Sequence, residues 1–110
     1  MNYKVVYTSE FGKEIKKLSR KYPSLQSDFG HFFEEISRNP FLGTPLGNNC
    51  YKIRLAIKSK RKDKSGGARI ITCAQIIMQT VILISIYDKS ERADISDKEI
   101  KERLKNFLEY

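Results

Sequence analysis

The apolar residues of the N-terminal third recur at helical spacing in two neighbouring stretches. The first contains Phe11, Ile15 and Leu18, and it follows Thr8, which is suited to cap a helix. Pro23 ends this stretch, because the residue before a proline is driven out of the helical region. The pattern therefore predicts two antiparallel helices, preceded by a short strand over residues 3–7. In the second helix one face is apolar, with Leu25, Phe29, Phe32, Phe33 and Ile36.

Residues 41–49 are rich in Gly, Pro and Asn and are expected to form a loop. After this loop, apolar and charged residues alternate, so the spacing of the apolar residues changes to every second position. This alternation predicts a half-buried strand with its cations on the open face. Two further strands are expected, over about residues 69–78 and over residues 81–87, and the second is apolar enough to be central in the sheet. The alternating residues are Lys52, Arg54 and Lys58 against Ile53, Leu55 and Ile57.

A third helix is expected at the C-terminus, where Ile100, Leu104 and Phe107 recur at helical spacing. Ser96 and Glu99 form the capping pattern that starts such a helix. The order of elements predicts an α+β fold in a single domain over residues 1–110. The expected sheet is small, antiparallel-dominated and four-stranded, with an N-terminal helical hairpin and a C-terminal helix.

The excess of positive charge is concentrated in one segment. The chain has a formal net charge of +8, and residues 52–69 contain eight basic residues and one acid, Asp63. Such a patch attracts polyanions, so nucleic acid is the first candidate partner and an acidic protein is the second. The alternative is a solvated lysine-rich hairpin that binds nothing.

The sequence indicates neither a cofactor nor a membrane segment. Cys50 and Cys73 do not form a Cys-x-x-Cys pair and His31 is the only histidine, so no metal site is expected. No apolar run reaches the roughly 18 residues needed to span a bilayer, and the N-terminus lacks the features of a signal peptide. We therefore expect a cytoplasmic protein with reduced thiols, no cofactor and no membrane partner.

The basic segment contains the groups that RNA cleavage by the neighbouring 2′-hydroxyl requires. A lysine crowded by other cations has a lowered pKa and can transfer protons, whereas arginine stabilises charge on the phosphate. A tyrosine can stack on a base or orient the attacking oxygen. Lysines that alternate on a strand also occur in inert sheets, so this pattern by itself leaves both interpretations open.

Three segments resemble motifs of the RelE/ParE superfamily of toxins. The run from Cys50 to Leu55 is similar to the second-strand motif of RelE-type toxins. Residues 64–71 are similar to the HigB/RelE-like segment Ser-Gly-Gly-x-Arg followed by apolar residues, and residues 83–91 to the last strand and the basic turn. The element order also matches the superfamily, and the long loop over residues 58–67 resembles the HigB-like branch.

The resemblance implies the toxin of a type II toxin–antitoxin system, acting as a ribosome-dependent mRNA interferase. Such a toxin is a metal-independent endoribonuclease, a hydrolase that inhibits translation. In the family, a tyrosine lies beyond the basic turn, where this chain has Ser96, so Tyr87 or Tyr110 would take that role. The implied catalytic residues are Lys52, Arg54, Arg69, Tyr87 and Lys89, and further RNA contacts are implied for Lys58, Lys60, Arg61, Lys62 and Lys64.

Each implied residue has a role within this resemblance. Lys52 and Arg54 hold the RNA backbone, and either of them is a candidate for proton transfer. Arg69 stabilises the scissile phosphate, and Lys89 belongs to the basic turn.

The implied partners are mRNA on the ribosome and a cognate antitoxin that is acidic or has an acidic segment. ParE-type toxins share the fold but inhibit DNA gyrase by binding, so gyrase inhibition is the alternative function. A member that binds its antitoxin but has lost activity is a third possibility. The concentrated cations favour the ribonuclease.

Overall fold

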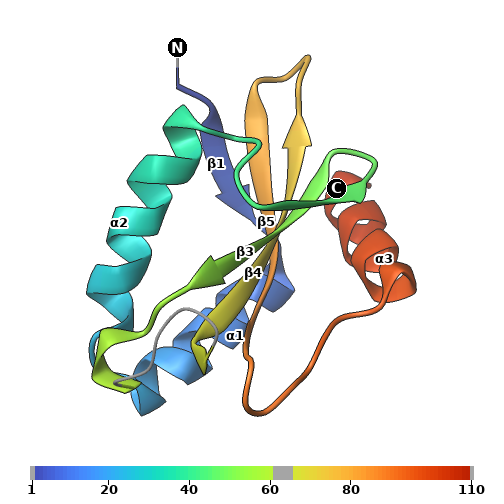
Figure 1. Cartoon of the computed structure of the whole chain (residues 1–110). Helices are drawn as coiled ribbons and strands as arrows, with labels where there is room; N and C mark the ends of the chain where they lie inside the picture. Colours follow the sequence, from blue (N-terminus) through green and yellow to red (C-terminus); the bar gives the residue numbers. More distant parts are fainter. Residues whose placement is uncertain (1, 61–65, 110) are drawn as a thin grey trace.

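Five strands form one mixed sheet in the computed structural model, which describes residues 2–60 and 66–109 (Figure 1). The strands lie in the order β1-β5-β4-β3-β2. β1 runs parallel to β5, and every other neighbouring pair is antiparallel. The strands are β1 (Lys4–Tyr7), β2 (Thr44–Gly47), β3 (Cys50–Leu55), β4 (Ala68–Gln75) and β5 (Thr80–Asp88).

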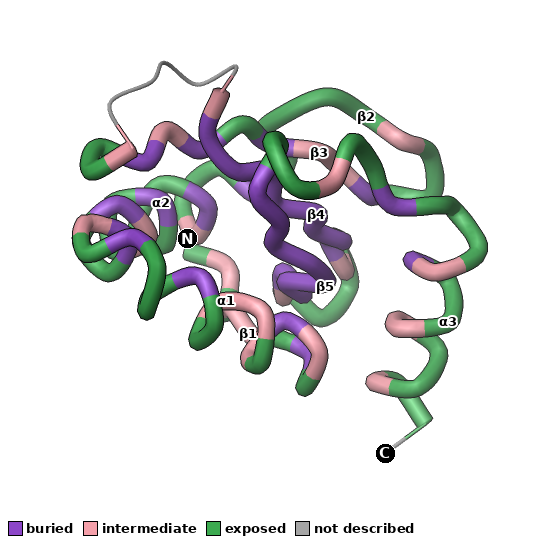
Figure 2. Tube along the Cα trace, turned by 90° about the horizontal axis from the view of Figure 1, so that it is seen from below, coloured by how far each residue is buried: buried purple, intermediate pink, exposed green. Residues whose placement is uncertain are grey.

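Helices cover both faces of this sheet. The hairpin of α1 (Ser9–Lys21) and α2 (Leu25–Arg38) packs on one face, and α3 (Asp97–Leu108) lies against the other (Figure 1). Buried positions therefore follow β4 and β5 through the centre of the molecule, whereas α3 buries only Ile100 fully (Figure 2). The α+β class, the helical hairpin and the C-terminal helix are confirmed.

The helix boundaries follow the capping residues expected from the sequence. The Thr8 hydroxyl accepts a hydrogen bond from the Phe11 amide, and the Ser96 hydroxyl accepts one from the Glu99 amide. On α2, Phe32 and Ile36 are buried, but Phe33 is 40% exposed, so its expected place in the core was wrong. Phe33 instead packs edge-on against Phe29 at the surface.

The sheet has one strand more than the four that were expected. β2 occupies part of the segment expected to be a loop, and it joins β3 through a two-residue turn at Asn48 and Asn49. Both asparagines have positive φ values of 53° and 61°, as the common tight hairpin turn requires. Asparagine tolerates this region, so the signal for a hairpin lay in the turn residues and not in β2 itself.

Two strand ends also differ from the expected ones. β3 ends at Leu55, and Lys58 begins a short 3₁₀ helix, Lys58–Lys60, instead of extending the alternating pattern. β4 ends at Gln75, and the chain reverses over residues 76–79, where Gln79 has a φ of 48°. No helix in the described part of the chain is long and apolar enough to cross a membrane.

Candidate functional site

Three of the expected site residues form a row across the central strands, on the face of the sheet that packs against α3. Arg54 of β3 pairs with Arg69 of β4, and Arg69 pairs in turn with Tyr87 of β5. We call these three residues the cross-strand row. Lys52 lies two residues before Arg54 and therefore on the same face of β3.

The two arginines of the cross-strand row lie directly opposite each other on β3 and β4. The Ala74 amide donates to the Asn49 carbonyl, which marks that pair as hydrogen-bonded in the β3–β4 ladder. Pairs alternate along an antiparallel ladder, so Arg54 and Arg69 form a non-hydrogen-bonded pair, the kind that brings side chains closest. Guanidinium groups from two neighbouring strands can both donate to one anion.

A bulge in β5 places Tyr87 on this face. Ile71 pairs with Ser85 while Thr72 pairs with Leu83, so Ile84 is an extra residue in β5. Without it, the strict alternation from Leu83 would put Tyr87 on the face of α1 and α2. With it, Tyr87 packs with Ile84 in the cluster under α3.

Side chains from two helices satisfy the backbone at this bulge. Glu14 of α1 accepts a hydrogen bond from the Ile86 amide at 3.3 Å. Arg103 of α3 donates to the Ile84 carbonyl at 3.1 Å, and its guanidinium also pairs with both Glu14 oxygens. The bulge is therefore held by one ion pair that joins α1, α3 and β5.

Asp94 connects Tyr87 to Lys52. Its Oδ1 accepts hydrogen bonds from the Tyr87 hydroxyl at 3.3 Å and from the Ile95 amide at 2.8 Å, and it lies 2.9 Å from Lys52 Nζ. The hydrogen bond from Lys52 is the largest cause that lowers the pKa of Asp94. This carboxylate therefore carries a negative charge at neutral pH within the cationic site.

Tyr87 keeps its proton at neutral pH. Burial, followed by the nearby Asp94 charge and the hydrogen bond to it, raises the pKa of Tyr87 to about 12. Arg92 lies over the Tyr87 ring, with its guanidinium carbon 5.8 Å from the ring centroid. Tyr87 is thus a hydrogen-bond donor with a fixed ring, and it is not suited to act as a base.

The remaining expected residues differ in how accessible they are. Arg54 and Lys58 are exposed, whereas Arg69 is 5% exposed and donates to the Ala68 carbonyl at 3.1 Å. Lys89 is exposed just after β5, and its Nζ lies 3.4 Å from the Ala93 carbonyl. The expected RNA contacts Arg61, Lys62 and Lys64, and the alternative tyrosine Tyr110, lie outside the described residues.

Lys60 is placed differently from the surface RNA contact that was expected. Its Nζ is 2.5 Å from Asp88 Oδ1, and its side chain is only 10% exposed. Burial alone would raise the pKa of Asp88, but hydrogen bonds from Lys60, Tyr22 and Ser90 outweigh it and hold that pKa well below its usual range. Lys60 therefore anchors the start of the basic loop to the end of β5.

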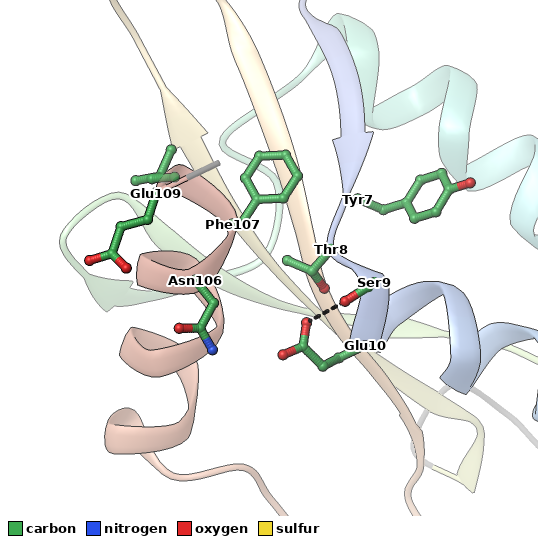
Figure 3. Close-up of a pocket in the computed structure, with 8 residues that line it drawn as sticks. Tyr7, Thr8, Ser9, Glu10, Asn106, Phe107 and Glu109 are labelled. Atoms are coloured by element: carbon green, nitrogen blue, oxygen red, sulfur yellow. Dashed lines mark hydrogen bonds between the residues drawn. The ribbon is translucent and has the colours of Figure 1, made fainter.

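One cleft among the described residues lies away from the cations. It has a volume of about 960 Å³ and separates the start of α1 from the last turns of α3 (Figure 3). Its lining includes Glu10, Phe107 and Glu109 but none of the expected site residues. A smaller cleft of about 790 Å³ runs beside Lys52, Arg54 and Lys58, between β3 and α2. Its α2 side carries Asp28, Glu34 and Glu35 beside Arg38, so most of its cations lie along β3 and at Lys58.

The sequence did not indicate Asp94 and Arg92 as site residues. They follow β5 in an irregular segment, so no periodic pattern assigns them to a face of the sheet. Their only signal was their position in the short link between the apolar strand β5 and the capped helix α3. In the described part of the chain, no group of three His, Cys, Asp or Glu residues could hold a metal ion.

Comparison with known proteins gives a fold and no close relative. No family profile and no curated protein matches the chain. A mutant of the E. coli toxin RelE in the free state is 20% identical, with a TM-score of 0.65, and the alignment covers 96% of this chain and 98% of that chain. The toxin–antitoxin complex RelBE2 of Mycobacterium tuberculosis gives 21% identity and a TM-score of 0.60, over 86% of this chain and 95% of that one.

The intact E. coli RelBE toxin–antitoxin complex is similar to the same degree. It is 21% identical with a TM-score of 0.61, over 78% of this chain and 95% of that chain. The chain therefore has the fold of RelE toxins, which confirms the fold expected from its motifs.

Proposed function

We propose that this chain is the toxin of a type II toxin–antitoxin pair and that it cleaves mRNA on the ribosome. The observation that carries the proposal is the opposition of Arg54 and Arg69, with Tyr87 next in the row and Lys52 beside them. Cations from two neighbouring strands on one face of the sheet can hold a phosphate from several sides through charge-assisted hydrogen bonds.

The proposed chemistry assigns a part to each residue of the site. Arg54 and Lys52 lie at the edge of the open cleft and bind the RNA backbone. Arg69 is held at the base of the row and stabilises charge on the scissile phosphate. Lys52 is the candidate for proton transfer, and Tyr87, whose ring is buried under Arg92, helps to position Lys52 through Asp94. Lys89, exposed in the turn after β5, is a further contact for the RNA backbone. No metal takes part in this scheme.

The likeness to toxin–antitoxin complexes supports a cognate antitoxin as partner. A net charge of +8 favours an antitoxin with an acidic segment, because opposite charge speeds capture. The place of action that follows from this proposal is the cytoplasm, where translating ribosomes are found.

The test is primer extension on a reporter message in a cell-free translation system, with Arg54→Gln as the variant. Arg54 is exposed, so its loss leaves the core unchanged. A hydrogen bond from a charged group contributes about 1.5–3 kcal/mol, so we expect cleavage to slow roughly 10- to 100-fold. The thermal midpoint of the variant should stay close to that of the wild type, because Arg54 is exposed.

The matched control is Arg20→Gln, which removes an exposed arginine from α1 and should cleave like the wild type. Cuts that appear only during translation and weaken in Arg54→Gln alone would support the ribonuclease. An intact message together with blocked gyrase supercoiling in a parallel assay would replace it with the ParE-like function.

A further inference from the structure

Cys50 and Cys73 lie directly opposite each other on β3 and β4. Because the neighbouring pair of Asn49 and Ala74 is hydrogen-bonded, Cys50 and Cys73 form a non-hydrogen-bonded pair. Such pairs have Cα atoms about 4.5 Å apart, within the range of roughly 4.4–6.8 Å that a disulfide bond spans. Register alone therefore brings the two thiols within bonding reach.

The hairpin turn before β3 holds both sulfur atoms at one place. Cys50 Sγ lies 3.7 Å from the Asn48 carbonyl oxygen, and Cys73 Sγ lies 3.8 Å from the same oxygen. Asn48 has its fixed left-handed φ of 53°, so this carbonyl has a defined direction. Both thiols are free and buried in the described structure. Both sulfur atoms thus lie beside one carbonyl oxygen at the end of the cross-strand pair.

We propose that Cys50 and Cys73 are an oxidation site, at which a hydroperoxide converts the two thiols into a reversible disulfide bond. The site is independent of the proposed ribonuclease function. It lies under α3, in the same apolar cluster as Ile100, and away from the cross-strand row.

The reaction balances with hydrogen peroxide as the oxidant. The Cys73 thiolate attacks one peroxide oxygen and breaks the O–O bond, which gives a sulfenic acid and a hydroxide that takes up a proton. Cys50 Sγ then attacks Cys73 Sγ, and the hydroxyl group leaves as water with the proton of the Cys50 thiol. Two thiols and one peroxide thus give one disulfide and two water molecules, and both electrons come from the sulfurs.

Two features of the surroundings favour this reaction. The hydrogen bond from Cys50 lowers the pKa of Cys73 to about 7, and a second one from Gln75 acts in the same direction, so thiolate is available near neutral pH. A cleft of about 280 Å³ between the hairpin turn and α3 has Cys50 in its wall, and Cys73 lies directly opposite Cys50 on β4, so a small oxidant reaches the pair from the side of Cys50. Leu46 and Ile100 line the same cleft.

The bond would tie together the strands on either side of the basic segment. Residues 50 and 73 enclose the loop that carries Lys58 and Lys60, and closing a loop of this length restricts the unfolded chain. We expect oxidation to raise the thermal midpoint by on the order of 10 °C.

The test treats the folded wild-type protein with hydrogen peroxide, then unfolds it in iodoacetamide and measures its mass. The sequence has two cysteines, so the result is unambiguous. We expect a monomer that has lost two hydrogens and takes up no label, and whose labelling at both cysteines returns after dithiothreitol. Cys50→Ser and Cys73→Ser should each fail to give this species.

Three results would overturn the proposal. One is labelling of both cysteines after peroxide treatment, and another is a mass that has gained oxygen atoms without losing two hydrogens. The third is a disulfide found only between two chains. All three are read from the wild-type protein, so they do not depend on whether the serine variants fold. None of them bears on RNA cleavage, which the translation assay measures separately.

Discussion

Asp94 sets the charge that an RNA phosphate meets at the site. Its carboxylate lies 2.9 Å from Lys52, so a phosphate must compete with it for that ammonium group. If the proposed function holds, Asp94→Asn removes this competition and binds a single-stranded oligoribonucleotide several-fold more tightly, since an exposed ion pair contributes up to about 1 kcal/mol. Fluorescence anisotropy at fixed salt measures the change.

Glu102→Gln is the matched control for this prediction. Glu102 is exposed on α3, and its substitution changes the net charge by the same amount. An equal gain in affinity for both variants would show that only the total charge matters. Weaker binding by Asp94→Asn would instead show that the carboxylate holds Lys52 and Tyr87 in the geometry that binds RNA.

Single residues of the site were predicted where a strand period assigned them to a face. Lys52 and Arg54 alternate with Ile53 and Leu55, and the structure keeps all four as expected. The contact of Lys60 with Asp88 was not predicted, because it joins positions 28 residues apart and leaves no local pattern. Sequence reasoning thus found the exposed cations and missed the ion pair inside the fold.

The buried carboxylate of Asp88 joins three elements at one point. It accepts hydrogen bonds from Tyr22 at the end of α1, from Lys60 and from Ser90. Because these bonds lower the folded-state pKa of Asp88, its contribution to stability is present above the unfolded pKa of about 3.9. That contribution is lost as the pH falls towards the folded-state value.

We therefore expect the free energy of unfolding to fall as the pH decreases from about 5 to 2, and to fall less in Asp88→Asn. At neutral pH the same variant should lose about 3–5 kcal/mol, because Lys60 is left buried without its counter-charge. Urea unfolding followed by circular dichroism measures both values. The double variant Asp88→Asn with Lys60→Met should recover part of the stability that Asp88→Asn loses at neutral pH. The prediction is contradicted if the free energy of unfolding falls equally between about pH 5 and 2 in the wild type and in Asp88→Asn.

Elements were predictable where their pattern is local. The three helices carry apolar residues at helical spacing, α1 and α3 also have capping residues at their starts, and both features are read over a few turns. β2 has four residues and a proline, and it is a strand only because β3 pairs with it. The bulge at Ile84 depends on Glu14 and Arg103, which lie 70 residues upstream and 19 residues downstream. Nothing within β5 itself indicates that Tyr87 changes face.

At the scale of the whole molecule, the charge distribution predicts how RNA binding depends on salt. Each phosphate contact on a single strand releases a counterion and contributes about −0.7 to the slope of log K against log salt concentration. Lys58 is exposed in the cleft beside β3 and carries part of the excess charge. If it contacts RNA, Lys58→Gln should make the slope shallower by about 0.7.

Lys13→Gln removes the same charge from the exposed surface of α1 and should leave the slope unchanged. Equal changes in both variants would mean that RNA is attracted by net charge alone. A change confined to Lys58 would mean that the strand has a defined path beside β3, as a protein that positions one phosphate between Arg54 and Arg69 requires.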